Sequence, residues 1–130
     1  MRKLYVIALL ILTTQAGCWV RTQTNASAPD TFRRKIGSVA TVKEDLFLYD
    51  NVDSYTAMPN DETNADRKYV AKLPRGTKVN VDNLISRLAP AGKYYYFVCE
   101  SDAVPFKFDV PVNPYWKTDD DFLYLDFARR

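Results

Sequence analysis

The chain begins with one apolar run and continues with short stretches in which apolar and polar residues alternate. Leu4–Leu12 is almost entirely apolar, the bases Arg2 and Lys3 precede it, and small residues lead from it to Cys18. A positive tip, a short apolar core and small residues at the end are the anatomy of a secretory signal peptide, and the run is too short to span a bilayer. The pattern therefore predicts that residues 1–17 are an export signal.

The segment after this signal is polar and has no hydrophobic period. Residues 18–32 mix charged, amide, hydroxyl and small side chains, a composition typical of a tether rather than of a packed element. Short runs in which apolar and polar residues alternate begin soon afterwards and recur as far as Phe127, with loops between them and without an internal repeat. We therefore expect a linker at 18–32 and one small domain at 33–130.

Within that domain, β-prone runs are separated by turn residues. Tyr94–Glu100 is rich in aromatic residues, and Phe106–Val112 places its apolar residues on one face of a strand. Residues 84–89 fit either more strand or a helical turn. The remaining predicted strands are Ile36–Lys43, Leu46–Tyr49, Tyr69–Leu73, Lys78–Val81 and Phe122–Phe127.

Turn chemistry separates these strands. Pro74–Thr77 and Pro90–Lys93 combine proline with glycine, which tight turns favour because proline fixes φ and glycine supplies a positive φ. Residues 50–66 and 113–121 are long polar loops. Short strands at this spacing, without a convincing amphipathic helix, predict an all-β fold built as a small antiparallel barrel or sandwich.

Three segments of the domain resemble a bacterial SH3-like domain: Val39–Val42, Leu46–Tyr49 and Val70–Val81. In that family a leu-pro-x-gly-thr-x-val turn joins two strands of a five- or six-stranded barrel, and Leu73–Val79 matches this turn. The resemblance implies a small antiparallel SH3-like barrel of five to six strands. It also implies a groove that binds cell-wall glycan or peptide.

The residues around Cys18 allow two interpretations. Gln15–Cys18 resembles the signal of bacterial lipoproteins, in which small residues precede a cysteine that is lipidated and becomes the mature N-terminus. This resemblance implies lipidation of Cys18 and attachment to a membrane. The alternative is ordinary cleavage after Ala16, which would leave Cys18 to pair with Cys99, the only other cysteine, in an oxidising compartment.

Charge argues against a nucleic-acid partner. Lys and Arg number 18 against 16 Asp and Glu, but Arg2 and Lys3 lie in the predicted signal, so the mature chain is balanced. A neutral domain has no electrostatic footprint for nucleic acid or for an anionic membrane surface. We therefore expect contact with a membrane through a lipid anchor alone.

Candidate catalytic chemistry is sparse. The chain has no histidine, which excludes Ser-His and Cys-His nucleophiles and histidine-containing metal sites. Cys99 lies in an aromatic run without an obvious basic partner, and the acids at 119–121 lack the glycine and spacing of a calcium loop. We predict no enzyme, no catalytic residues, no metal and no cofactor.

Binding is the remaining class of function. Large aromatic residues in the two polar loops either cover the ends of the barrel or contact a partner, and neighbouring acids would steer a basic partner. The candidate partner-binding residues are Tyr55, Tyr115, Trp116, Asp119, Asp120 and Asp121.

Export, small size and lack of catalytic equipment together favour one class of protein. The sequence predicts a non-enzymatic binding module of the periplasm or bacterial cell envelope, lipid-anchored to a membrane. Its expected partner is another envelope or secreted protein, as for an immunity or inhibitor protein or an accessory subunit of an envelope machine. The alternative is binding of peptidoglycan glycan or peptide through an SH3-like groove.

Overall fold

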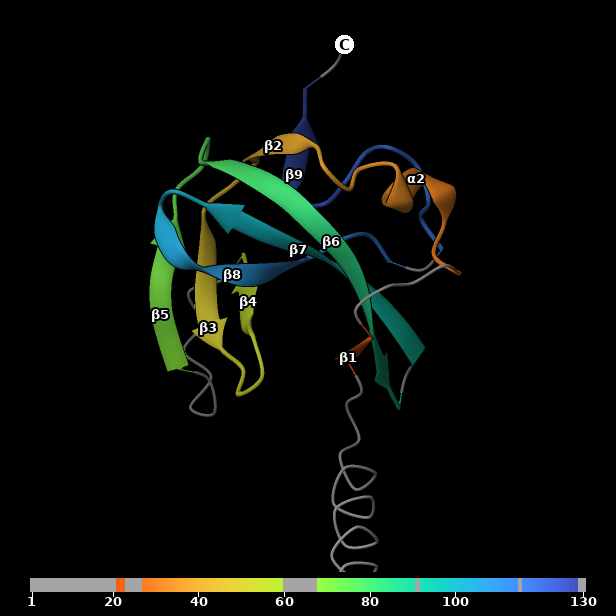
Figure 1. Cartoon of the computed structure of the whole chain (residues 1–130), viewed down its shortest axis with the longest axis horizontal. Coiled ribbons are helices and arrows are strands. Elements are labelled where there is room, and N and C mark those ends of the chain that lie inside the picture. Colours follow the sequence, from red (N-terminus) through yellow and green to blue (C-terminus); the bar gives the residue numbers. More distant parts are fainter. Residues whose placement is uncertain (1–20, 23–26, 60–67, 91, 115, 129–130) are drawn as a thin grey trace, which may run out of the picture.

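The computed structural model describes residues 21–22, 27–59, 68–90, 92–114 and 116–128. These residues form nine strands and one short helix, which confirms the all-β class (Figure 1). Among them, no helix is long and apolar enough to cross a membrane. The elements are β1 (Arg21–Thr22), α2 (Asp30–Arg33), β2 (Val39–Val42), β3 (Leu46–Asp50), β4 (Tyr55–Met58), β5 (Lys68–Leu73), β6 (Lys78–Ala89), β7 (Gly92–Ser101), β8 (Val104–Pro111) and β9 (Leu125–Phe127).

All the strands belong to one sheet that curls into a half-barrel (Figure 1). The order is β5-β3-β4-β8-β7-β6-β2-β9, and β1 pairs with β6 beside this path. Every pairing is antiparallel except that of β4 with β8, which is parallel at Thr56 and Asp109. The prediction of a purely antiparallel barrel is therefore wrong in two respects, since the sheet is mixed and curls only half-way round.

A long hairpin of β6 and β7 forms the middle of the sheet. Residues 84–89, which the sequence left open, continue β6 as strand and pair with β7 as far as Ala89 and Gly92. Leu84 and Ile85 are both buried although they are adjacent and point to opposite faces of a strand. Both faces of the sheet are therefore covered at this point, which explains why the sequence alone shows no clean alternation there.

The region predicted as one loop at 50–66 contains a strand. Tyr55–Met58 forms β4, which pairs with β3 and buries Ala57 in the core. A run of four residues between polar segments is too short to show the two-residue alternation of a strand, so the sequence did not predict this strand. At the other end of the chain, only Leu125–Phe127 of the predicted final strand is paired.

The folded part of the chain begins earlier than expected. Ala28 and Phe32 are buried in the core, and the ring of Phe32 lies 5.8 Å from that of Tyr95 and 5.9 Å from that of Phe122. The last residues of the predicted linker thus belong to the domain, and a boundary at Arg33 falls inside α2.

The predicted turn between β5 and β6 is confirmed. Gly76 has a φ of 88°, a conformation that glycine adopts without a steric penalty. The amide of Thr77 donates a 3.0 Å hydrogen bond to the carbonyl of Pro74, which closes the turn. The amide of Gly76 also donates to the carbonyl of Val42 at 2.8 Å, so the turn is tied to the end of β2.

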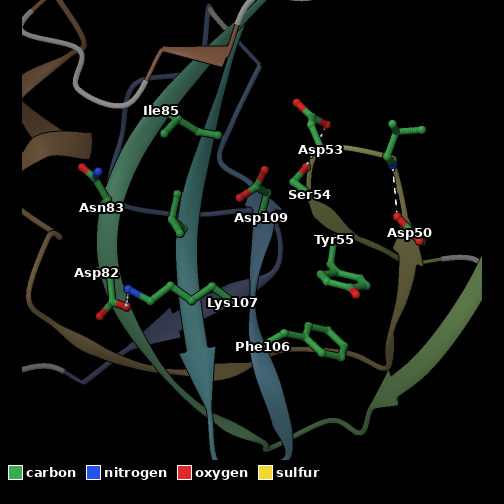
Figure 2. Close-up of a pocket in the computed structure, with 12 residues that line it drawn as sticks. Asp50, Asp53, Ser54, Tyr55, Asp82, Asn83, Ile85, Phe106, Lys107 and Asp109 are labelled. Atoms are coloured by element: carbon green, nitrogen blue, oxygen red, sulfur yellow. Dashed lines mark hydrogen bonds and ion pairs between the residues drawn. The ribbon is translucent and has the colours of Figure 1, made fainter.

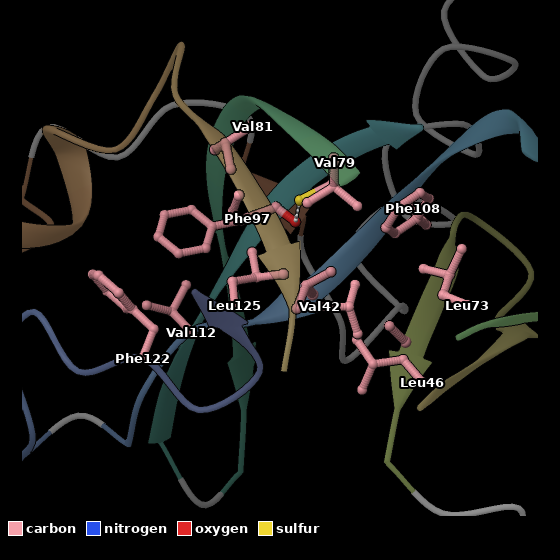
Figure 3. Close-up of a cluster of buried hydrophobic side chains, with 14 of the residues drawn as sticks. Val42, Leu46, Leu73, Val79, Val81, Phe97, Phe108, Val112, Phe122 and Leu125 are labelled. Atoms are coloured by element: carbon pink, nitrogen blue, oxygen red, sulfur yellow. Dashed lines mark hydrogen bonds between the residues drawn. The ribbon is translucent and has the colours of Figure 1, made fainter. Parts of the chain in front are cut away.

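The main hydrophobic core lies between the curled strands and is shown in Figure 3. The consecutive tyrosines of β7 divide between the two faces, as a strand requires. Tyr95 packs against the core with Phe97 and Cys99, whereas Tyr94 is exposed. The largest fully buried members of the core are Phe32, Leu46, Leu48, Leu73, Leu84, Phe97, Phe108 and Leu125.

Candidate functional site

The structure places Tyr55 differently from the other predicted partner-binding residues. It begins β4 and is half-buried, and its ring stacks on that of Phe106 with centroids 3.9 Å apart and planes 25° apart. This ring also packs against the core. Tyr55 is therefore a packed strand residue and not the loop aromatic that the sequence predicted. Tyr115 lies outside the described residues.

Trp116 lies on the connection between β8 and β9, and 72% of its surface is exposed. This connection is held by Asn113, which is buried. The Asn113 side-chain amide donates to the carbonyls of Asp119 and Asp121 at 3.4 and 3.3 Å, and its oxygen accepts from the Leu123 amide at 3.1 Å. An exposed tryptophan thus sits on a loop whose path is fixed by a buried side chain.

The three predicted acids lie on the same connection and are exposed. Asp121 forms ion pairs with Lys43 at 2.9 Å and with Lys117 at 3.7 Å. The hydrogen bond and charge of Lys43, with the charge of Lys117, lower the pKa of Asp121 below its ordinary value of 3.8. Asp121 consequently ties the loop to the end of β2, while Asp119 and Asp120 form no ion pair among the described residues.

Tyr55 and Trp116 do not form one surface. The connection that carries Trp116 runs beside α2, where the Thr31 hydroxyl donates to the Thr118 carbonyl at 2.6 Å. In Figure 1, α2 and β4 lie on different sides of the long β6–β7 hairpin. The described predicted binding residues therefore divide into an exposed set on the β8–β9 connection, Trp116 and the three acids, and a packed strand residue, Tyr55.

A buried ion pair that the sequence reading missed lies beneath the turn between β3 and β4. Arg87 of β6 and Asp109 of β8 are joined at 2.9 Å between Nη2 and Oδ2, and they are only 6% and 1% exposed. The pair reaches across β7, where the Arg87 guanidinium lies 5.3 Å from the ring centre of Tyr96. Buried charges are tolerated in this way only when they are paired.

The β3–β4 turn closes over this ion pair. The Arg87 guanidinium also donates to the Ser54 hydroxyl and lies 3.8 Å from the Asp53 carboxylate. Within the turn, the Val52 amide donates to the Asp50 carboxylate at 3.1 Å. Val52 itself has a φ of 65° and is fully exposed. A β-branched residue in the left-handed region is a genuine outlier, and such strain concentrates at functional sites.

Two pockets lie on either side of this turn and share Asp50, Val52 and Asp53. The first has a volume of about 570 Å³ and is shown in Figure 2; we call it the stack pocket. The second, of about 590 Å³, is called the arginine pocket. The stack pocket is further lined by Ser54, Tyr55, Asp82, Asn83, Ile85, Val98, Phe106, Lys107 and Asp109, and the arginine pocket by Tyr49, Asn51, Thr56, Met58, Arg87, Tyr96 and Pro111.

The pockets are acidic. Their lining includes four aspartates against two cations, and both cations are already paired. Lys107 reaches from β8 across β7 to Asp82 on β6, at 3.0 Å, and this hydrogen bond raises the pKa of Lys107 (Figure 2). No group of three or more His, Cys, Asp or Glu residues in the described part of the chain is placed to hold a metal ion.

The sequence carried a signal for the buried ion pair. Arg87 interrupts a run of apolar and small residues at 84–89, and Asp109 lies between Phe108 and Val110. A charged residue within an otherwise apolar strand is rarely buried unless it has a partner of opposite charge. Asp109 on a predicted strand and Arg87 in the segment left open between strand and helical turn therefore indicate a pair, although which segments meet is not readable from local pattern.

Cys99 is not a reactive thiol. It is fully buried in β7, and burial, together with the negative charges of Asp109 and Asp82, raises the pKa of the thiol. Its sulfur lies 3.7 Å from the carbonyl oxygen of Phe97. A thiol with a raised pKa is a poor nucleophile at neutral pH. Cys18, the alternative disulfide partner, lies outside the described residues.

Comparison of the chain with models of protein families, with curated proteins and with solved structures found no match. The geometry therefore defines the class of protein by itself. It is an all-β protein whose mixed sheet curls into a half-barrel, with one fixed loop that exposes a tryptophan and one acidic turn flanked by pockets.

Proposed function

We propose that this protein is an exported binding module of the bacterial cell envelope, without enzymatic activity, that binds another protein. The partner is a secreted or envelope protein, such as a toxin or lytic enzyme that the module neutralises or a machine of which it is a subunit. Support comes from the predicted export signal and from the lack of histidine.

One observation carries the choice of a protein partner. Trp116 is 72% exposed, on a connection that buried Asn113 holds in place. Tryptophan is the residue type most enriched among those that dominate protein interfaces. A fixed loop loses little conformational entropy on binding, so contact energy is retained as affinity. Asp119 and Asp120 beside it would accelerate encounter with a basic partner.

Trp116→Ala is expected to abolish capture of the partner from an envelope extract. An anchoring tryptophan contributes more than about 2 kcal/mol, or about 30-fold in the dissociation constant. The thermal midpoint should stay nearly unchanged, because the side chain is mostly exposed. The measurement is affinity capture by the full chain, followed by quantitative mass spectrometry of the recovered protein.

Tyr94→Ala is the matched control, because Tyr94 is also an exposed aromatic residue but lies on the β6–β7 hairpin. It should leave capture intact. Equal capture by wild type and the Trp116 variant would contradict the proposal. Co-sedimentation of the wild type with purified sacculi, with no protein recovered from the extract, would replace it with the peptidoglycan alternative.

We also propose that the half-barrel is a divergent SH3-like domain enlarged by additional strands. The turn at Leu73–Val79 that carries the resemblance joins β5 to β6, with Gly76 at a φ of 88°. The family pattern has five or six strands and the described residues form nine, so at least three strands would be additions to it.

Anchoring through Cys18 is the remaining part of the proposal. Wild-type protein should partition into detergent and incorporate a fatty-acid analogue, whereas Cys18→Ser should be recovered in the water-soluble periplasmic fraction. Lipidation converts the chain from soluble to membrane-attached, so phase partitioning reports it directly. A water-soluble wild type in which Cys18 and Cys99 both resist alkylation until a reductant is added would contradict lipidation and establish the disulfide.

A further inference from the structure

We propose that the Asp50–Ser54 turn and its two pockets form a docking surface for a basic protein segment, whose Lys or Arg side chains enter the pockets. This inference goes beyond the contact at Trp116, since it concerns a different surface and specifies the chemistry of the partner. It does not depend on what Trp116 binds.

Charge is the first argument. Arg87 is neutralised by Asp109, and Lys107 is paired with Asp82. Asp50 accepts a hydrogen bond from a backbone amide, and the half-exposed Asp53 carboxylate lies 3.8 Å from Arg87, beyond hydrogen-bonding distance. Among the described residues Asp50 forms no ion pair, and Asp53 has only this long contact with Arg87, which is already paired with Asp109. The four aspartates that line the pockets therefore outnumber the two cations, and the pockets attract positive charge.

The walls of the pockets fit a long basic side chain better than a bare cation. In the arginine pocket, Tyr49, Met58 and Pro111 present apolar surface, and in the stack pocket the stacked rings of Tyr55 and Phe106 do so. Lysine and arginine bury their apolar stems on such surfaces and keep the charged end near water or carboxylates. The carboxylates at the shared turn are placed to receive that end.

Two donors buried beside the arginine pocket lack a hydrogen-bond partner in the described part of the chain, and an occupant with acceptors would reach them by displacing the wall that covers them. Among the described residues, Nε of Arg87 and the hydroxyl of Thr56 have no hydrogen-bond partner, and both residues line the arginine pocket. An unpartnered buried donor costs about 1–3 kcal/mol. A simple amine has no acceptor to offer, whereas the carbonyl oxygens of a peptide do. A protein segment therefore fits the arginine pocket better than a free diamine.

The turn between the pockets is ordered before binding. The Asn51 amide donates to the Ser54 carbonyl at 2.8 Å, and Arg87 holds the Ser54 side chain from below. Val52 projects from the tip, fully exposed, with its backbone in the left-handed region. Such a turn presents an apolar contact between two acidic pockets without an ordering cost when the segment binds.

The test uses the full chain in detergent and a synthetic peptide of alternating lysine and alanine with blocked ends. Calorimetry gives the dissociation constant, and amide chemical shifts locate the peptide. Asp50→Asn combined with Asp53→Asn should weaken binding by at least about fivefold, because both carboxylates shared by the two pockets are lost. Asparagine keeps the oxygen that accepts the Val52 amide, so the turn is retained.

Asp102→Asn combined with Asp126→Asn is the matched control, because it removes the same charge from two exposed residues that line neither pocket. It should leave the dissociation constant within about twofold of the wild-type value. A peptide with norleucine in place of lysine has the same stem without charge and should not bind. In the wild type, the shifted amides should be those of residues 50–54, 87 and 107–109.

Three results would each overturn the proposal. Equal weakening by both double variants would mean attraction to net charge alone. Binding of cadaverine as tight as that of the peptide would mean a small-amine site. Amide shifts that leave residues 50–54 unchanged would place the peptide elsewhere, and this measurement on the wild type decides the matter even if a variant fails to fold.

Discussion

Asp109→Leu is expected to destabilise the protein by about 3–5 kcal/mol, because it leaves the Arg87 guanidinium buried without its counter-charge. The two groups are 2.9 Å apart and almost completely buried, and Asp109 also lies where β4 meets β8. The loss should be measured as a shift in the urea midpoint with an unchanged slope. Unfolding in urea should be followed by tryptophan fluorescence and by circular dichroism in parallel.

The double variant Arg87→Met with Asp109→Leu distinguishes the cost of an unpaired buried charge from the cost of altered packing at the same position. Replacing both partners by apolar residues of similar volume is often neutral or stabilising, so most of the lost stability should return. Lys107→Met is the exposed control, because Lys107 also reaches across β7 to an aspartate, and little change is expected. A double variant as unstable as Asp109→Leu would contradict this account.

The parts of the fold that local pattern determines were predicted well. Alternation identified most strands, because a two-residue period appears within a few positions. Turn chemistry located the β5–β6 turn, since Pro74 and Gly76 have specific dihedral preferences and the observed φ of Gly76 is 88°. The all-β class followed from these elements, without knowledge of which strands pair.

Long-range pairing was not readable from the sequence. The parallel contact of β4 with β8 joins Thr56 to Asp109, and no local pattern specifies such a partner. The acidic turn depends on the same contact, because Arg87 reaches Asp109 and Ser54 only after three separate segments meet. Local pattern placed Trp116 in a loop, where it is exposed, but its role in binding stays a prediction. The pockets were not predicted, because they exist only in the assembled sheet.

The N-terminal boundary was misplaced for a related reason. Within residues 27–32 only Ala28 and Phe32 are buried. Two buried residues are too few to show a hydrophobic period, and because their neighbours are polar the segment resembles a linker. Phe32 packs against Tyr95 and Phe122, which lie far along the chain. A single aromatic anchor thus attaches an otherwise polar segment to the core.

Phe32→Ala should consequently cost about 3–5 kcal/mol, even though Phe32 lies in a segment whose composition is that of a linker. Its side chain is fully buried, and removing it would leave a cavity between the rings of Tyr95 and Phe122. For a domain of this size, the thermal midpoint should fall by at least about 10 °C. Calorimetry of the full chain measures both quantities.

Ile36→Ala is the control for the same segment, since Ile36 is an exposed apolar residue four positions further on, and it should cost less than about 1 kcal/mol. A large loss for Phe32 with a small one for Ile36 would show that α2 is part of the cooperative domain. Small losses for both would mean that α2 contributes nothing to stability, and the domain would then begin after it.

Because Thr31 of α2 also holds the loop of Trp116 through Thr118, undocking of α2 should loosen that loop as well. The Phe32 variant should therefore weaken partner capture in proportion to the fraction of molecules in which α2 has left the core.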